Sequence, residues 1–165
     1  MIFVTVGTHE QQFNRLVEYM DKWSMDHMDE EVIIQTGFST YEPKKASWSK
    51  LYPYRTMIEM VDRARIVITH GGPSSFIMPL RIGKIPIVVP RNHEFDEHVN
   101  NHQVDFCRKV ADRQGNIIVV ENIDELGKIL DGYEEVVGEM TSGLTSNNER
   151  FCTEFEKIVE GLLRK

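Results

Sequence analysis

The feature that most constrains the fold is an alternation between short β-branched runs and longer stretches whose apolar residues have helical spacing. The runs consist almost entirely of Ile, Val and Thr, which is typical of strands buried on both faces. Between them, apolar residues recur every three or four positions, as in Phe13, Leu16, Val17 and Met20. This alternation predicts βαβ units and therefore a parallel α/β sheet. The predicted strands are residues 2–6, 32–35, 66–69, 87–89 and 117–120.

The length predicts one domain and a C-terminal extension. A chain of 165 residues with 41% hydrophobic residues can bury a single core. We predict a domain over residues 1–140 and a flexible joint with a C-terminal helix over 141–165. Residues 141–148 are mostly Ser, Thr, Gly and Asn, and an amphipathic stripe follows at Phe151, Phe155, Ile158, Val159 and Leu162. The helix predicted over residues 148–164 either packs on its own sheet or docks a partner, and both roles stay open.

Charge and cysteine content narrow the class of protein. The formal net charge is -7, which argues against binding a polyanionic nucleic acid. Cys107 and Cys152 have no CxxC spacing, so we expect two reduced thiols in a cytoplasmic protein. No basic leader precedes the first strand, and no apolar stretch approaches the ~20 residues of a membrane span.

The most informative segment is the strand over residues 66–69 and the turn that follows it, His70-Gly71-Gly72-Pro73-Ser74-Ser75. Glycines allow a ligand to approach the backbone, and the first turn of a helix offers free N–H groups to an anion. The turn is therefore a candidate phosphate site. Alternatively, Gly71 and Gly72 only form a tight turn between strand and helix. Pro79 predicts that the helix is short or kinked before Gly83.

The glycines do not match a dinucleotide-binding enzyme. The first strand is followed by Gly7-Thr8-His9-Glu10 rather than GxGxxG, and the second ends in Gln35-Thr36-Gly37 with no acid for a ribose. A nicotinamide-dependent oxidoreductase is therefore not expected.

A family resemblance rests on residues 70–90, which contain His70-Gly71-Gly72 and the run from Gly83 to Pro90. This segment resembles the donor-site signature of glycosyltransferase family 28. Residues 2–10, 70–76 and 101–103 also resemble the small soluble catalytic subunit of the two-part, dolichol-linked UDP-N-acetylglucosamine transferase, and still more its bacterial capsular and exopolysaccharide counterparts. The resemblance spans residues 1 to about 125. It implies a Rossmann-like parallel sheet forming the C-terminal, donor-binding half of a GT-B enzyme.

The resemblance implies roles for individual residues. The glycine loop would hold the donor diphosphate, backbone near Tyr54 would hold uracil, and Glu97 and His98, at the start of a helix, would meet sugar hydroxyls, with Glu94 and Asp96 close by. The Tyr54 ring has packing as its alternative use. Met78 stands where relatives place a ribose-binding carboxylate, so that contact is lost. The complete donor-binding set implied is Gly7, Thr8, Tyr54, Gly71, Gly72, Pro73, Ser74, Ser75, Glu97, His98, Asn101 and Gln103.

Three residues are candidates for catalysis, namely His70, His9 and Glu10. His70 could carry a proton or hold phosphate, or it could be a turn residue with a satisfied ring. His9 and Glu10 follow the first strand and could face the same crevice, or lie in a solvated loop. His98 and His102 stand four apart but lack the glutamate of HExxH, so no metal and no cofactor are predicted.

Together these observations predict the donor-binding, catalytic subunit of a two-component glycosyltransferase of polysaccharide biosynthesis. The resemblance implies a UDP-sugar donor, a hexose or hexose derivative as the transferred group, and a lipid-linked saccharide acceptor. The chain lacks an acceptor-binding half, so a membrane-associated partner subunit would supply it and recruit this chain to the inner face of the membrane. The alternative is a non-catalytic nucleotide-sugar-binding module that enhances or regulates a partner glycosyltransferase.

Overall fold

The computed structural model describes residues 1–140 together with residues 153, 156 and 157. Its centre is a six-stranded sheet in the order β3-β2-β1-β4-β5-β6, and every neighbouring pair is parallel. The predicted parallel α/β fold is therefore confirmed. The strands are β1 (Ile2–Thr5), β2 (Val32–Gln35), β3 (Ser47–Ser49), β4 (Ile66–His70), β5 (Ile87–Val89) and β6 (Ile118–Val119).

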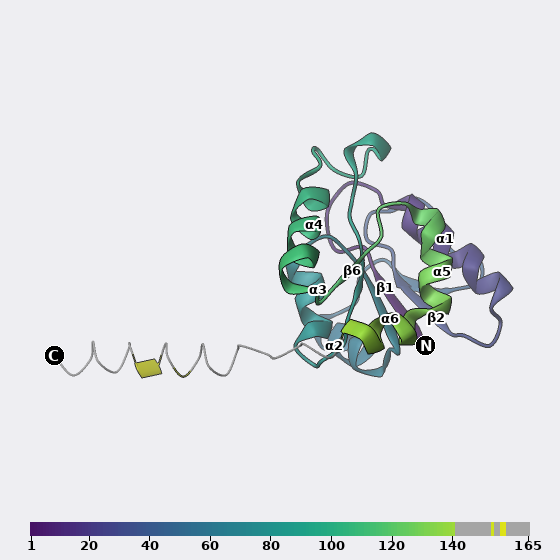
Figure 1. Cartoon of the computed structure of the whole chain (residues 1–165). Helices are drawn as coiled ribbons and strands as arrows, with labels where there is room; N and C mark the ends of the chain where they lie inside the picture. Colours follow the sequence, from purple (N-terminus) through teal and green to yellow (C-terminus); the bar gives the residue numbers. More distant parts are fainter. Residues whose placement is uncertain (141–152, 154–155, 158–165) are drawn as a thin grey trace.

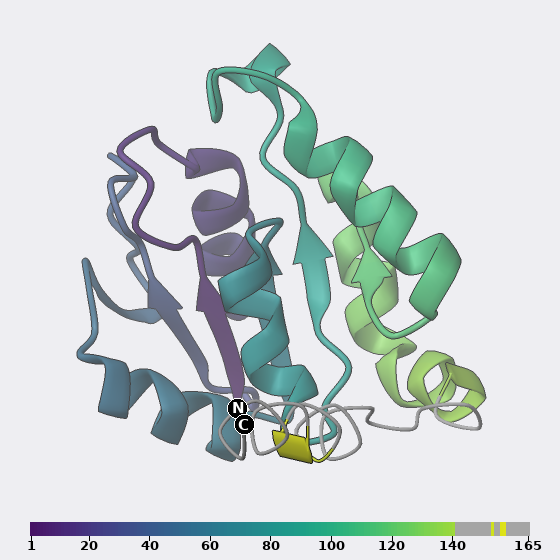
Figure 2. The same ribbon diagram turned by 90° about the vertical axis from the view of Figure 1, so that its left-hand side faces the viewer.

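Helices cover both faces of the sheet, as Figures 1 and 2 show. One face packs against α1 (Asn14–Asp26), α5 (Leu126–Asp131) and α6 (Tyr133–Met140). The other face packs against α2 (Tyr54–Arg63), α3 (Pro73–Leu80) and α4 (His102–Gln114). Two short 3₁₀ turns complete the fold, η1 (His93–Phe95) and η2 (Ile123–Glu125).

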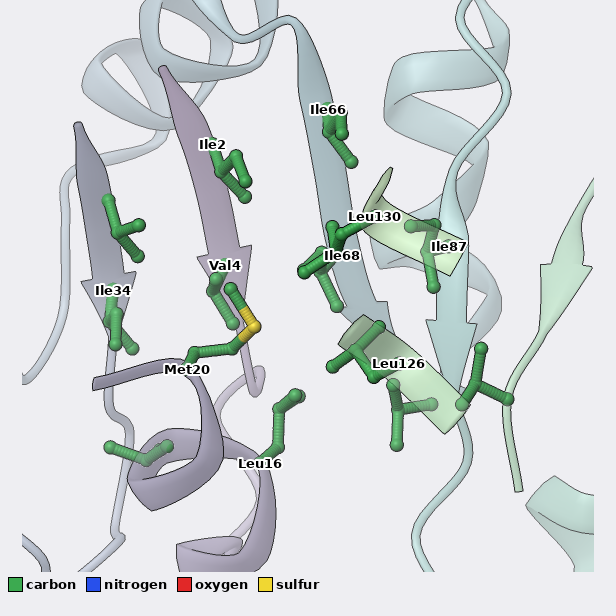
Figure 3. Close-up of a cluster of buried hydrophobic side chains, with 14 of the residues drawn as sticks. Ile2, Val4, Leu16, Met20, Ile34, Ile66, Ile68, Ile87, Leu126 and Leu130 are labelled. Carbon is green, nitrogen blue, oxygen red and sulfur yellow. The ribbon is translucent and has the colours of Figure 1, made fainter. Parts of the chain in front are cut away.

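The largest core cluster lies between the sheet and the α1 side. Figure 3 shows Ile2, Val4, Ile34 and Ile68 from the central strands meeting Leu16 and Met20 of α1, and Leu126 and Leu130 of α5. Because side chains alternate along a strand, Phe3 and Val67 point to the opposite face and pack with Val61 of α2. Burial on both faces explains why these strands are continuously apolar in sequence.

The structure corrects one element and confirms another. Residues 47–49 are absent from the predicted strands, but β3 begins at Ser47 and pairs with β2 at Ile33. The sequence Ser-Trp-Ser carries no β-branched residue, so only pairing with β2 makes it a strand. The helix after the glycine loop is short, as Pro79 predicted, and ends at Leu80.

The predicted C-terminal joint and helix, residues 141–165, lie outside the described residues except for 153, 156 and 157, so the boundary after 140 stays a prediction. Cys152 also lies outside them. Within the described part of the chain, no helix is long and apolar enough to cross a membrane.

The strand order reverses between β1 and β4. From β1 the chain proceeds outward to β2 and β3, then returns to place β4 on the other side of β1. The loops that leave β1 and β4 therefore turn in opposite directions at the carboxyl ends of the strands. In open α/β sheets ligands bind in the crevice that such a reversal creates. The segments after Thr5 and His70 lie at that position.

Candidate functional site

Three glycines lie in a continuous row across the carboxyl ends of β2, β1 and β4. A Cβ on Gly37 would lie 2.7 Å from the carbonyl oxygen of Gly7, and one on Gly7 would lie 2.3 Å from Nε2 of His70. A Cβ on Gly72 would lie 2.2 Å from Cε1 of the same ring. Gly7 and Gly37 also have positive φ angles, which favour glycine. We call Gly37, Gly7 and Gly72 the glycine row. It has no room for side chains.

His70 occupies the space that Gly7 and Gly72 leave. His70 is 9% exposed; its Nδ1 accepts a hydrogen bond from the N–H of Gly72 at 3.0 Å, and its Nε2 lies 3.0 Å from Oγ of Ser75. Burial, helped by the positive charge of Arg91, lowers the pKa of His70 to about 4. Because Nδ1 accepts the Gly72 N–H, the neutral ring carries its proton on Nε2, and this N–H donates a hydrogen bond to Oγ of Ser75. This geometry favours the turn role of His70, and its catalytic role stays a prediction.

The first turn of α3 faces the reversal point. The N–H of Gly72 donates to Nδ1 of His70, and the N–H of Ser75 donates to the carbonyl of Gly72. Pro73 has no backbone N–H. Ser74 is exposed, and its N–H lies in the first helical turn, where the helix provides no carbonyl acceptor. A helix start with such a donor attracts anions.

Gly71 and the start of α4 fit closely together. A Cβ on Gly71 would lie 2.9 Å from Sγ of Cys107 and 3.0 Å from Oε1 of Gln103. Gln103 is buried and accepts a hydrogen bond from the N–H of Arg91. Asn101 accepts one from the N–H of His93. Gln103 and Asn101, both predicted to bind the donor, thus hold loops of the site in place.

Arg91, which the sequence analysis did not identify, is the largest completely buried side chain among the described residues. Its Nη1 donates to the carbonyls of Gln11, Gln12 and Glu97 at 2.9 to 3.0 Å, and Nη2 donates to Val6 at 2.9 Å. Burial lowers its pKa to about 10. Arg91 fixes the loop after β1 against the loop after β5 and places a positive charge near the rings of His70, His9 and His98. An arginine two residues after a buried strand was its only sequence signal.

Glu97 is also completely buried, and both of its carboxylate oxygens have partners. Arg15 contacts it twice at 2.9 Å, and the N–H of Asn92 donates to it at 3.0 Å. The prediction that Glu97 and His98 begin a helix is wrong, because α4 begins only at His102. The delay has a local cause: Asp96 adopts a left-handed conformation, with φ of 55°, and Asn100 accepts the N–H of His102.

Three histidine rings form a contiguous group beside the crevice. The ring centroids of His9 and His98 lie 4.6 Å apart, and those of His98 and His102 lie 4.4 Å apart. Burial lowers the pKa of His9 and of His98, and the Arg91 charge and the neighbouring rings add to the effect. The predicted His9 and His98 are thus brought together. No group of three or more His, Cys, Asp or Glu side chains suited to hold a metal ion occurs within the described residues.

The other residues singled out in the sequence lie in different parts of the fold. Thr8 and Glu10 are exposed on the loop after β1, next to the glycine row. Tyr54 is 67% exposed, so the alternative that its ring packs is wrong. It begins α2, which lies toward the amino ends of the strands (Figure 2). Met78 packs beside Phe3 and Val61.

The six-stranded parallel sheet matches a class of protein domain, the C-terminal half of GT-B glycosyltransferases. Two solved structures share this fold, the glycotransferase of kitacinnamycin and the glycosyltransferase SnogD from Streptomyces nogalater. Their TM-scores are 0.58 and 0.55, with 17% and 18% sequence identity. Each match covers 86% of this chain but 37% and 38% of those proteins, respectively.

Sequence comparison gives the family. Residues 1–151 match the glycosyltransferase family 28 C-terminal domain, and the chain belongs to this family. It is also 35% identical over 69 residues to the UDP-N-acetylglucosamine transferase subunit ALG13 of Yarrowia lipolytica (strain CLIB 122 / E 150). That match covers 42% of this chain and 33% of the relative, so the chain matches about a third of the relative's length.

Proposed function

We propose that this chain is the donor-binding subunit of a two-component glycosyltransferase that transfers a hexose or hexose derivative from a UDP-sugar to a lipid-linked saccharide. The observation that carries the proposal is the first turn of α3, which presents its free N–H at the strand-order reversal in a family 28 domain. The similarity to a UDP-N-acetylglucosamine transferase subunit supports a UDP-sugar as the donor and a second subunit as the partner.

The chemistry required of this subunit is to bind the donor and stabilise the leaving group. As the sugar departs, negative charge develops on the UDP diphosphate. The dipole of α3 and the buried charge of Arg91 both stabilise an anion at this edge of the sheet. Gly7, Gly71, Gly72, Pro73 and Ser75 shape the loop beneath it, with Thr8 alongside.

The acceptor and the catalytic base belong to the interface with the partner in this proposal. His70 is a poor base because it is buried and both ring nitrogens are engaged. His9 and Glu10 lie on the loop after β1 and are better placed to meet an acceptor. The partner is membrane-associated and recruits this chain to the cytoplasmic face of the membrane. If the chain instead only binds a nucleotide sugar and enhances its partner, the partner alone should retain transfer activity.

The binding test compares Ser74→Asp with Ser74→Asn, which have the same shape and differ in charge. A carboxylate in the first turn favours the helix, so both variants should fold. UDP affinity, measured by calorimetry, should fall at least tenfold in Ser74→Asp relative to Ser74→Asn because the carboxylate repels the diphosphate. Uridine affinity should not differ between them. Equal UDP affinity in the two folded variants would show that the diphosphate does not bind at the start of α3.

Substitution of Gly72 by a bulky residue is a weaker test. A side chain there would collide with His70, so lost binding would also follow from a distorted loop. The transfer test is activity with the membrane partner: transfer by the pair, and by neither subunit alone, supports the two-component enzyme.

A further inference from the structure

A hollow lies beside the glycine row, lined by residues 36–42 together with Trp48 and Lys50. It has a volume of about 400 Å³, and its walls include Phe38, Tyr41 and Trp48. We call this hollow the aromatic pocket. Phe38 and Trp48 are each 41% exposed. Ligand pockets of this size are common, and large aromatic side chains left accessible at a concave surface often mark a binding site.

The aromatic pocket is held in a fixed shape by α1. Asn14 accepts hydrogen bonds from the N–H groups of Thr40 and Tyr41, at 2.8 and 3.0 Å, and donates to the hydroxyl of Thr40. The N–H of Phe13 donates to Ser39. The hydroxyl of Tyr41 donates to the buried carboxylate of Asp21 at 2.8 Å. The loop is therefore preorganised, although two of its aromatic rings contact solvent.

The chemistry of the wall fits a pyranose ring. A sugar has an apolar C–H face that packs on an aromatic ring, and hydroxyl groups that need donors and acceptors at its edge. The aromatic pocket offers both, because Thr40, Glu42 and Lys50 line it together with the rings. The Lys50 ammonium lies 4.5 Å from the centroid of Phe38, so the charge stands at the rim of an apolar surface.

The position links the aromatic pocket to the candidate donor site. Gly37 belongs both to its wall and to the glycine row, where it contacts Gly7. Trp48 is paired in register with Ile34, which packs on the α1 side, whereas α3 lies on the other face. The loop after β2 and the loop after β1 occupy the same edge of the sheet in Figure 2. A nucleotide over α3 and a sugar over Trp48 would thus approach the glycine row from opposite faces.

We propose that the aromatic pocket is a saccharide subsite that binds a pyranose ring during transfer. The assignment of that ring to the reaction rests on the proposed function, and the ring could come from the acceptor saccharide or from the donor. The binding itself is independent of UDP. A failure of UDP to bind and a failure of sugars to bind are therefore separate results.

The experiment uses the two tryptophans of the chain as reporter and control. Trp48 lines the aromatic pocket, whereas Trp23 lies on α1 and stacks on His27 with 3.8 Å between ring centroids. Indole N–H signals are followed by NMR in the full chain during titration with lactose, cellobiose and N,N′-diacetylchitobiose at millimolar concentrations. At least one disaccharide should shift Trp48 saturably and leave Trp23 in place. UDP-glucose or UDP-galactose shifting Trp48, where UDP does not, would assign the ring to the donor.

Variants complete the test. Phe38→Ala should weaken the disaccharide affinity about tenfold and leave UDP affinity unchanged. Phe106→Ala is the matched control, since Phe106 is 39% exposed on α4, outside the aromatic pocket. No saturable shift of Trp48 with any of these sugars, or equal shifts of both tryptophans, would overturn the proposal. A Trp48 signal that responds only to the partner subunit would also overturn it, and would identify a protein contact instead.

Discussion

Replacement of Arg91 by Met removes the buried guanidinium and its charge and keeps an apolar side chain in its place. The side chain donates to four carbonyls, of which those of Val6 and Glu97 are in its buried hydrogen bonds. Each buried carbonyl left without a donor costs about 1–3 kcal/mol. The carbonyls of Gln11 and Gln12 are only partly buried, and water can replace their partner. Relief from burying the charge offsets part of this cost.

The expected net loss in the free energy of unfolding is about 3–4 kcal/mol, a large share of the about 5–15 kcal/mol of a typical domain. Urea denaturation followed by circular dichroism measures it. With a slope of about 2 kcal/mol/M, the midpoint should fall by roughly 1.5–2 M. The matched control is Arg55→Met, because Arg55 is an exposed residue of α2 whose side chain contacts Glu59. The midpoint of this variant should not move.

A second readout separates the charge from the packing. Arg91 lowers the pKa of His70, but burial is the larger cause. In Arg91→Met the pKa of His70, measured by imidazole NMR, should rise above about 4 and stay below 6.5. Arg91→Lys keeps the charge and should show a smaller rise. A stability loss under about 1 kcal/mol, together with an unchanged His70 pKa, would refute the role assigned to Arg91.

Three further predictions concern buried groups. Asp21 accepts the N–H groups of residues 44–46 and the Tyr41 hydroxyl; although burial opposes this, these bonds lower its pKa below 3.8. Asp21→Asn should therefore lower the free energy of unfolding by about 2 kcal/mol at neutral pH. The difference in stability from wild type should shrink as the pH falls below 3.8 through the folded pKa of Asp21. A stability difference that stays constant in acid thermal melts would contradict this. Glu97→Ala leaves Arg15 without its carboxylate partner and should lower the free energy of unfolding by about 3 kcal/mol. We also predict that it weakens UDP-sugar binding more than UDP binding. Equal losses of affinity for the two ligands, measured by calorimetry, would make the role of Glu97 purely structural. Burial raises the pKa of Cys107 to about 12, so in a Cys152→Ser background the native thiol should react with iodoacetamide far more slowly than the urea-unfolded thiol, and equal rates would count against its burial.

The sequence by itself determined the parallel α/β class and the location of the glycine loop. Continuous Ile and Val runs exist because the strands are buried on both faces, and a glycine pair after a strand is required wherever a side chain would collide. These are local consequences of burial and backbone conformation, so they can be read along the chain. The short helix after Gly72 followed in the same way from Pro79.

Tertiary structure decided what the glycines face and which polar residues are internal. Gly72 makes room for His70, and Gly71 makes room for α4, so both have structural duties that their sequence context does not specify. The family resemblance implied that Glu97 contacts sugar hydroxyls, but the carboxylate is buried and binds Arg15, which is distant in the chain. The strand β3 exists only because β2 supplies its hydrogen-bonding partners. The contacts of Gly71 with α4, of Glu97 with Arg15 and of β3 with β2 join residues distant in sequence, and folding alone brings them together.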